Sequence, residues 1–330
     1  MLYLQGLGHF HPENVITNKF ISELEIGSDE QWIMERVGIA ERRTSLTLDY
    51  IKRTKNSDPR AAIEASTHSR AQAGGAAARM AMQRAGLDAA DIGMVVSGTS
   101  TPRYNIPAEA GIIAAELGID APCLDINAAC STFLVQLAHL NAMDPARTPS
   151  FILVVNPENY THCVNYSDRR VAPLFGDGTS AAVVSASEPS KIRIEGLAYG
   201  SRPDGWDKVI IPACGHFTQD GSHVQRFAIR KATEGVRRLQ EQYPRDASDF
   251  KFVGHQANLM MLDTVCRRCR IPQGRHLHNV VDYGNTGSSS APAVLSQNWD
   301  SLLPGDSIAV AVVGSGLTWG HALMKIAAEE

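Results

Sequence analysis

Apolar blocks alternate with mixed blocks along the whole chain, and this pattern predicts strands that alternate with helices. Residues 93–100 and 150–159 are short β-branched runs with the length of buried strands. Residues 73–92 are rich in good helix formers and contain Gly86 as a stop signal. Residues 131–143 place apolar side chains at positions 133, 134, 137 and 140, which share one face of a helix. The first half therefore has an α/β pattern.

The second half repeats this alternation. Its predicted helices cover residues 226–242, 259–269 and 290–302, and its predicted strands lie within 250–258 and, as a pair about a glycine loop, within 306–327. The halves meet near residues 185–190, so we predict an N-terminal half of residues 1–187 and a C-terminal half of residues 188–330.

Two further segments carry specific expectations. Residues 46–72 are polar, charged and weakly periodic, which is typical of an irregular surface excursion or cap. Residues 107–119 predict a helix that opens with Pro107 in its first turn.

Composition narrows the class of protein. The chain has 330 residues, of which 44% are hydrophobic and 20% charged, as in soluble proteins with a sizeable core. We expect no membrane span, because no run of 18 uncharged apolar residues occurs. The formal net charge of −4 argues against general nucleic-acid binding. The first residues lack the basic and apolar regions of a signal peptide, so a cytoplasmic location is the simplest expectation.

The cysteines do not predict a disulfide framework, because six of them are scattered over a long chain. Cys266 and Cys269 form a C-x-x-C pair, but no second pair or His pair accompanies them. A structural or incidental role is favoured over a metal or redox role, and no metal site is predicted.

Three polar stretches at strand ends carry the candidate chemistry. Cys130 stands at the junction of a predicted strand and helix, where the helix N-terminus favours the thiolate. His255 and Asn258 follow a β-branched run, and Asn285 lies in a glycine-flanked turn. A nucleophile and two hydrogen-bond donors would suit covalent catalysis. Each residue taken alone is also compatible with a structural role, and Cys130 with that of a core cysteine.

The chain resembles the thiolase superfamily, and in particular the β-ketoacyl-acyl-carrier-protein synthase III family. The resemblance rests on motifs in the family's order: "GLGHFHPENVITN", "EQWIMERVGIAERR", "NAACSTF", "LFGDGTSAAVV", "GHQAN", "YGNTGSSS" and "GSGLTWG". It implies an α/β protein with the thiolase-like αβαβα layered fold of two similar halves, usually a homodimer.

The resemblance also implies a ping-pong decarboxylative Claisen condensation. Cys130 would accept an acyl group from coenzyme A or an acyl carrier, and a malonyl thioester would then lose CO₂ and attack it. His255 and Asn285 would donate hydrogen bonds to the malonyl thioester oxygen, and the glycine loop near Ser315 would complete an oxyanion hole at Cys130. No tightly bound cofactor is implied, since the coenzyme A thioester is a substrate.

Matching positions imply further binding residues. Trp32 and Arg36 would hold the adenine of coenzyme A between an indole and a guanidinium, with Arg169 and Asn258 beside the nucleotide. Arg226 matches a basic position that docks the acyl carrier protein.

Four departures from the family suggest a specialised acyl donor, such as a medium-chain, long-chain or branched one. Thr132 replaces a glycine and would crowd the pocket floor, whereas Ile106 replaces a phenylalanine contributed across the dimer and would enlarge the acyl pocket. Met260 replaces an arginine that helps to dock the carrier. The segment 46–72 is longer than usual and could cover the acyl tunnel.

Two other functions stay open. A same-fold acyltransferase would pass the acyl group to a hydroxyl or amine without decarboxylation, although Asn285 favours condensation. A non-catalytic partner subunit would tend to lack the Cys or His, and both are present.

Overall fold

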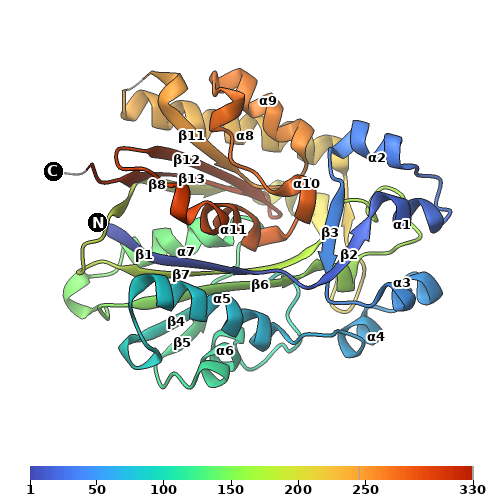
Figure 1. Ribbon diagram of the computed structural model, residues 1–330, viewed down its shortest axis with the longest axis horizontal. Coiled ribbons are helices and arrows are strands. Elements are labelled where there is room, and N and C mark those ends of the chain that lie inside the picture. Colours follow the sequence, from blue (N-terminus) through green and yellow to red (C-terminus); the bar gives the residue numbers. More distant parts are fainter. Residues whose placement is uncertain (245, 329–330) are drawn as a thin grey trace.

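The computed structural model describes residues 1–244 and 246–328, and it has five layers (Figure 1). Two β layers lie on either side of a central pair of helices, and further helices cover their outer faces. This is the α/β, thiolase-like layered fold that the resemblance implied.

The first half contributes one β layer and its outer helices. Its strands, in spatial order, are β5 (Cys123–Asp125), β4 (Met94–Ser97), β6 (Ile152–Asn159), β7 (Asp177–Ser185) and β1 (Leu2–Phe10). Helices α5 (Arg70–Ala85) and α6 (Glu109–Leu117) pack on the outer face. Gly86 ends α5 in the left-handed conformation, as the sequence predicts, whereas Pro107 precedes the N-cap of α6 rather than opening its first turn.

The second half repeats the order of four of these strands, β4-β6-β7-β1. Its strands are β11 (Phe250–Gly254), β12 (Ser307–Gly314), β13 (Thr318–Ile326) and β8 (Ile192–Ser201), covered by α8 (Gly221–Gln242) and α9 (Leu259–Cys269). In both halves a parallel pair is followed by two antiparallel pairings. The β layers join where Leu2–Leu4 pairs with Ile192–Ile194. The predicted boundary after residue 187 falls between β7 and β8 and stays a prediction.

The central layer consists of α7 (Thr132–Asn141) and α11 (Ser290–Gln297), each of which contacts strands of both halves. The sequence predicts one buried face for α7, yet Val135 and Gln136 are buried as well as the four predicted apolar side chains. A helix between two sheets has no solvent side, so Gln136 pairs instead with the buried amide of Asn156.

The remaining elements surround one end of the layers. They are β2 (Asn14–Thr17), α1 (Asn18–Glu23), α2 (Glu30–Val37), β3 (Glu41–Thr44), α3 (Leu48–Thr54), α4 (Pro59–Glu64), β9 (Val209–Ile210), β10 (Thr218–Gln219) and α10 (Val280–Tyr283). Residues 46–72, expected as a surface excursion or cap, contain two short helices that Thr47 and Asp58 cap. Asn56 ties the segment to the core by donating to the carbonyls of Thr161, His162 and Val164.

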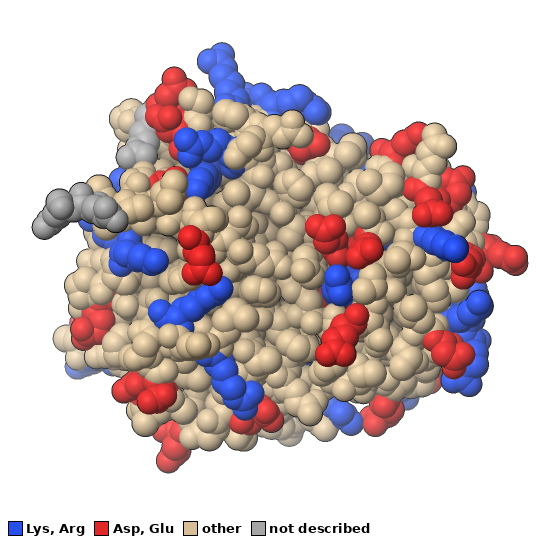
Figure 2. All heavy atoms as spheres, viewed as in Figure 1, with Lys and Arg blue, Asp and Glu red and all other residues tan. Residues whose placement is uncertain are grey.

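The surface carries both signs of charge. On the face shown in Figure 2, acidic and basic side chains are interspersed around a largely uncharged centre. No helix of the described residues combines the length and apolar character needed to cross a membrane. Cys266 and Cys269 are buried in the core beneath α9, and within residues 1–244 and 246–328 no three His, Cys, Asp or Glu side chains gather as a metal site.

Candidate active site

Cys130 lies on a strained turn between β5 and α7. Ala129 has a φ of 49°, which costs a residue with a Cβ about 1 kcal/mol. Thr132 closes the turn, since its Oγ1 lies 2.6 Å from the Ala129 carbonyl oxygen and accepts from the Ala128 N–H at 2.9 Å. Helix α7 begins at Thr132 with Ser131 as its N-cap, so Cys130 stands one residue before the cap.

A loop from the second half packs against this turn. A Cβ on Gly314 would lie 2.9 Å from the backbone nitrogen of Cys130, so only glycine fits there. Thr318 fixes the loop, because its Oγ1 donates to the Ala128 carbonyl at 3.1 Å. Ser315 follows Gly314 and bonds the Val209 carbonyl through its Oγ at 2.5 Å. The loop's backbone is thereby held beside that of the nucleophile, as the prediction for Ser315 requires.

His255 follows β11 and is buried and neutral. Its backbone N–H donates to the Ala311 carbonyl at 3.0 Å, and its Nδ1 lies 3.1 Å from Ser290 Oγ. The Ser290 oxygen accepts from the Gln256 N–H, so its own proton can go to Nδ1. That arrangement leaves the ring proton on Nε2. Burial lowers the pKa of His255 to about 4, so the ring is an uncharged donor at neutral pH.

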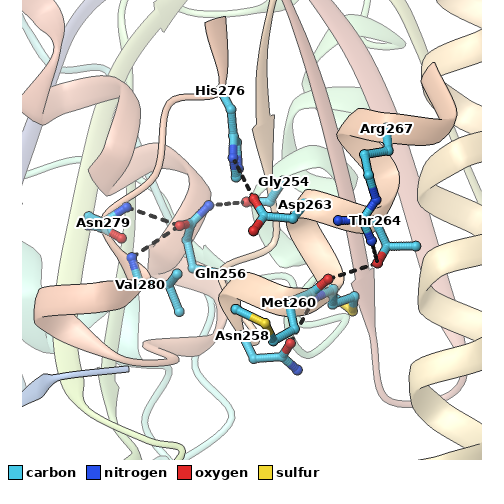
Figure 3. Close-up of polar contacts among 11 residues, drawn as sticks. Gly254, Gln256, Asn258, Met260, Asp263, Thr264, Arg267, His276, Asn279 and Val280 are labelled. Carbon is cyan, nitrogen blue, oxygen red and sulfur yellow. Dashed lines mark hydrogen bonds and ion pairs between the residues drawn. The ribbon is translucent and has the colours of Figure 1, made fainter. Parts of the chain in front are cut away.

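Gln256 connects the His255 strand end to the segment that leads to Asn285 (Figure 3). Its Nε2 donates to the Gly254 carbonyl at 2.7 Å, and its Oε1 accepts from the Asn279 and Val280 N–H groups at 3.1 and 3.3 Å. Gln256 is fully buried, so these bonds are protected from water and fix the two segments relative to each other.

Asn285 is held so that its amide nitrogen is available. Its Oδ1 accepts from the Gly287 N–H at 2.9 Å, while its Nδ2 has no partner among residues 1–244 and 246–328. Its backbone N–H donates to the Leu174 carbonyl at 2.9 Å, and its carbonyl accepts from the Gly176 N–H at 3.1 Å. Nδ2 is therefore a preorganised donor.

A cavity of about 350 Å³ brings Cys130, His255, Asn285 and Ser315 together. It extends from these residues to Trp32 and Arg36 on α2. Cys130 also lines a second cavity, of about 370 Å³, which we call the inner cavity. The walls of the inner cavity include Ser100, Tyr160, Ile211 and Phe217. Cys130 therefore lines both the cavity that reaches α2 and the inner cavity.

The sequence analysis missed two residues beside the thiol, Tyr160 and Glu158. The Tyr160 hydroxyl lies 3.8 Å from Cys130 Sγ, and its ring stacks on Phe175. Burial, together with the Glu158 carboxylate, raises the pKa of Cys130 to about 12. The expected thiolate is thus not the resting form, because the loss of hydration raises the pKa of Cys130 more than the nearby helix N-terminus lowers it. The signal was present as Asn-Pro-Glu-Asn-Tyr directly after an apolar run.

We expect Cys130 to react slowly with iodoacetamide at pH 7 and progressively faster up to pH 10, without a plateau. With a pKa of about 12, the reactive thiolate fraction grows about tenfold for each pH unit below that value. Glu158→Gln removes a negative charge, which should lower the pKa of the thiol and speed alkylation at any fixed pH. Intact-mass rates measure this, with the exposed Cys214 as internal reference and Cys130→Ala to assign the adduct. A plateau near pH 8 in the unmodified protein would contradict the expectation.

The residues implied for coenzyme A gather at the mouth of the 350 Å³ cavity. Trp32, Arg36 and Asn258 line it. The Arg169 guanidinium lies 4.3 Å from the centre of the Trp32 ring, closer than that of Arg36 at 5.9 Å. Asn258 also caps α9, since its Oδ1 accepts from the Met261 N–H at 2.8 Å. The site thus has an indole with two cations beside it.

The other predicted residues lie further away. Thr132 sits inside the nucleophile turn and lines neither cavity at Cys130, so it acts on the turn rather than on the pocket floor. Ile106 is 84% exposed and lines a neighbouring cavity. Arg226 is exposed on α8, whereas Met260 is half-buried beside Gly38. Of these four residues only Ile106 and Arg226 are exposed for a partner to contact.

Comparisons with known proteins agree with this geometry. A family model described as 3-oxoacyl-[acyl-carrier-protein] synthase III matches residues 124–203, and the model of its C-terminal part matches residues 245–326. The chain is 29% identical over 345 residues to the β-ketoacyl-[acyl-carrier-protein] synthase III of Sulfurovum sp. (strain NBC37-1), covering 98% of this chain and 96% of that relative.

Solved structures give the same assignment. The 3-oxoacyl-[acyl-carrier-protein] synthase III of Aquifex aeolicus VF5 superimposes with a TM-score of 0.87 at 26% identity, covering 98% of this chain and 100% of that one. The priming β-ketosynthase of the R1128 polyketide biosynthetic pathway superimposes with a TM-score of 0.83 at 28% identity, covering 100% and 97%. Cys130 falls in the first matched region, and His255 and Asn285 fall in the second. Over nearly its whole length the chain is therefore similar to enzymes of the β-ketoacyl-[acyl-carrier-protein] synthase III family.

Proposed function

We propose that the protein catalyses a decarboxylative condensation between an acyl group held on Cys130 and a malonyl thioester. The observation that carries this proposal is the cavity shared by Cys130, His255, Asn285 and Ser315, which continues to Trp32. A thioester that enters along this cavity would meet a nucleophile and two neutral donors at its inner end.

In the first half-reaction the Cys130 sulfur attacks the thioester carbonyl. The new S–C bond forms as the bond to the coenzyme A sulfur breaks, and the thiol proton passes to the departing thiolate. The backbone N–H groups of Cys130 and Ser315 would stabilise the oxyanion. Because the resting thiol is protonated, its ionisation would accompany the attack rather than precede it.

In the second half-reaction a malonyl thioester loses CO₂. His255 Nε2–H and Asn285 Nδ2–H would donate to its thioester oxygen as negative charge develops there. The carbanion attacks the acyl carbon, the bond to Cys130 breaks, and the released thiolate takes up a proton. A neutral imidazole suits this role, because its Nε2–H can still donate a hydrogen bond.

We infer the partners from the surface around the site. Coenzyme A thioesters would bind along Trp32, Arg36 and Arg169, and an acidic acyl carrier protein would approach Arg226. A homodimer is supported by two exposed apolar side chains that a second copy could cover. They are Leu124, 38% exposed on the edge strand β5, and Ile106, 84% exposed.

The proposal predicts two products in one incubation. With an acyl-CoA and a malonyl thioester we expect CO₂ and a β-ketoacyl thioester in equal amounts, measured by ¹⁴CO₂ release and by mass spectrometry. An acyl adduct on Cys130 without CO₂, together with transfer to an added alcohol or amine, would instead establish an acyltransferase. A protein that forms no adduct with coenzyme A or carrier-bound donors would contradict both.

A further inference from the structure

The inner cavity beside Cys130 continues into another cavity further from the thiol. Ser100 and Ile211 line both, so the inner cavity of about 370 Å³ adjoins a space of about 380 Å³, which we call the distal cavity. Pro59 and Ile63 of α4 form part of its wall. The segment 46–72 thus covers the space into which the far end of a Cys130-bound acyl chain would extend.

A buried guanidinium with no acceptor lines the distal cavity. Arg70, the first residue of α5, is only 6% exposed. Its Nε has no partner, and the side chain makes no hydrogen bond or ion pair within the described part of the chain. A guanidinium carries five N–H donors, and a buried donor left unpaired, as Nε is here, is destabilising. A group that supplies oxygen acceptors would remove this destabilisation.

The carboxylates near Arg70 raise its pKa by electrostatic attraction but form no hydrogen bond or ion pair with it in the described part of the chain. Glu109, Glu158 and Asp177 each favour its charged form, whereas burial lowers its pKa. Glu158 accepts from Thr99, Ser100 and Ser288, so its oxygens are already used. Asp177 is likewise occupied by donors from Ser45 and Thr161. Arg70 therefore has compensating charge at a distance but lacks a direct acceptor.

A second buried polar atom on the same wall is also unpaired. His162 is 3% exposed, and its Nε2 lies 3.0 Å from Ser45 Oγ. The Ser45 hydroxyl donates to Asp177, so His162 must donate from Nε2 and keeps a free lone pair on Nδ1. Burial lowers its pKa to about 3, which leaves the ring neutral. The wall offers strong donors from Arg70 and one acceptor from His162.

We propose that the acyl group carried by Cys130 bears oxygen at its far end, a terminal carboxylate being the best match, and that Arg70 binds it in the distal cavity. This inference rests on the proposed acylation of Cys130 and names its substrate class. A carboxylate offers a guanidinium two parallel acceptors, and a hydroxyl offers one acceptor plus a proton for His162 Nδ1. An unsubstituted alkyl chain would leave the Arg70 guanidinium and His162 Nδ1 unpaired.

The test compares donors that differ only at the far end. Acylation of Cys130 is followed by intact mass with butanoyl-, hexanoyl- and octanoyl-CoA, and with the ω-carboxy and ω-hydroxy acyl-CoA of each length. We expect at least one ω-oxygenated donor to react about 100-fold faster than its unsubstituted counterpart, since a site built for hydrogen bonds rejects an analogue that lacks them. The ω-carboxy and ω-hydroxy arms decide which oxygen group is bound.

The matched variants are Arg70→Met and Arg103→Met. Arg103 lines the same distal cavity but is already paired with Glu64 at 2.9 Å. We expect Arg70→Met to abolish the preference for oxygenated donors while changing the rate with unsubstituted donors less than threefold, and Arg103→Met to keep the preference. Free adipate should raise the melting temperature of the unmodified protein and not that of Arg70→Met, which reports binding without chemistry.

The outcomes separate this inference from the proposed function. Acylation by unsubstituted donors alone, or an Arg70→Met variant that loses thermal stability but keeps its donor preference, would overturn the inference and leave the condensing activity standing. A protein that no donor acylates would overturn both.

Discussion

Replacing Cys130 by alanine is expected to abolish acyl-enzyme formation and to lower the rate of β-ketoacyl product by at least about 10⁴-fold. Among the residues that the structure describes, Cys130 and Ser315 line both the 350 Å³ cavity and the inner cavity, but the Ser315 hydroxyl is bonded to the Val209 carbonyl. The Tyr160 hydroxyl beside the thiol is buried, and its pKa lies well above its usual value, so it cannot substitute. Intact mass and product formation measure the two steps separately.

Asn285→Ala provides the contrasting variant. It keeps the thiol and removes a donor meant for the malonyl oxygen, so we expect a normal acyl adduct with a condensation rate lowered by about 10²–10³-fold. Equal loss of both half-reactions in Asn285→Ala would show that the residue maintains the shape of the site rather than stabilising the carbanion.

Replacing Arg42 by methionine is expected to lower the free energy of unfolding by about 3–5 kcal/mol. Arg42 is fully buried, and its guanidinium donates to the carbonyls of Pro173 and Ile39 and to Asn18 Oδ1. Methionine fills much of the volume but leaves these buried acceptors without donors. Urea denaturation followed by tryptophan fluorescence measures the change.

Arg43→Met is the matched control for this prediction. The Arg43 side chain is 27% exposed and contacts the Tyr283 ring, so its loss should cost less than about 1 kcal/mol. A Cβ on Gly284 would meet the Arg42 side chain at 2.9 Å, so Arg42 also packs beneath the Asn285 loop. We therefore expect Arg42→Met to slow condensation more than acylation. Equal destabilisation by both variants would contradict the role assigned to buried Arg42.

The local sequence pattern was sufficient to predict many of the helices and strands, but not which of their faces are buried. Helix α5 ends at Gly86 as predicted, because a left-handed C-cap is a local property. The predicted single apolar face of α7 is incomplete, because a second sheet covers its other side. Residues 46–72 are weakly periodic since their two helices are short, and each depends on a cap rather than on a long apolar stripe.

The properties of the candidate site also divide into those that the sequence predicts and those that depend on the fold. Sequence motifs identified Cys130, His255 and Asn285, because each requires a particular residue type beside small or glycine neighbours. The pKa of the thiol could not be inferred, since it depends on Glu158 and on exclusion of water by residues far apart in the chain. The position of Thr132 inside the turn likewise follows from hydrogen bonds that no spacing shows.

By itself the sequence predicted much of the alternation of strands and helices, the resemblance to the family and three candidate catalytic side chains, because periodicity, caps and motifs are local. Only the tertiary structure decided which side chains share a cavity, which are deprived of water, and which buried donors lack an acceptor. These properties arise where two halves of the chain pack together, so Arg70 and Tyr160 acquire their significance only in the folded protein.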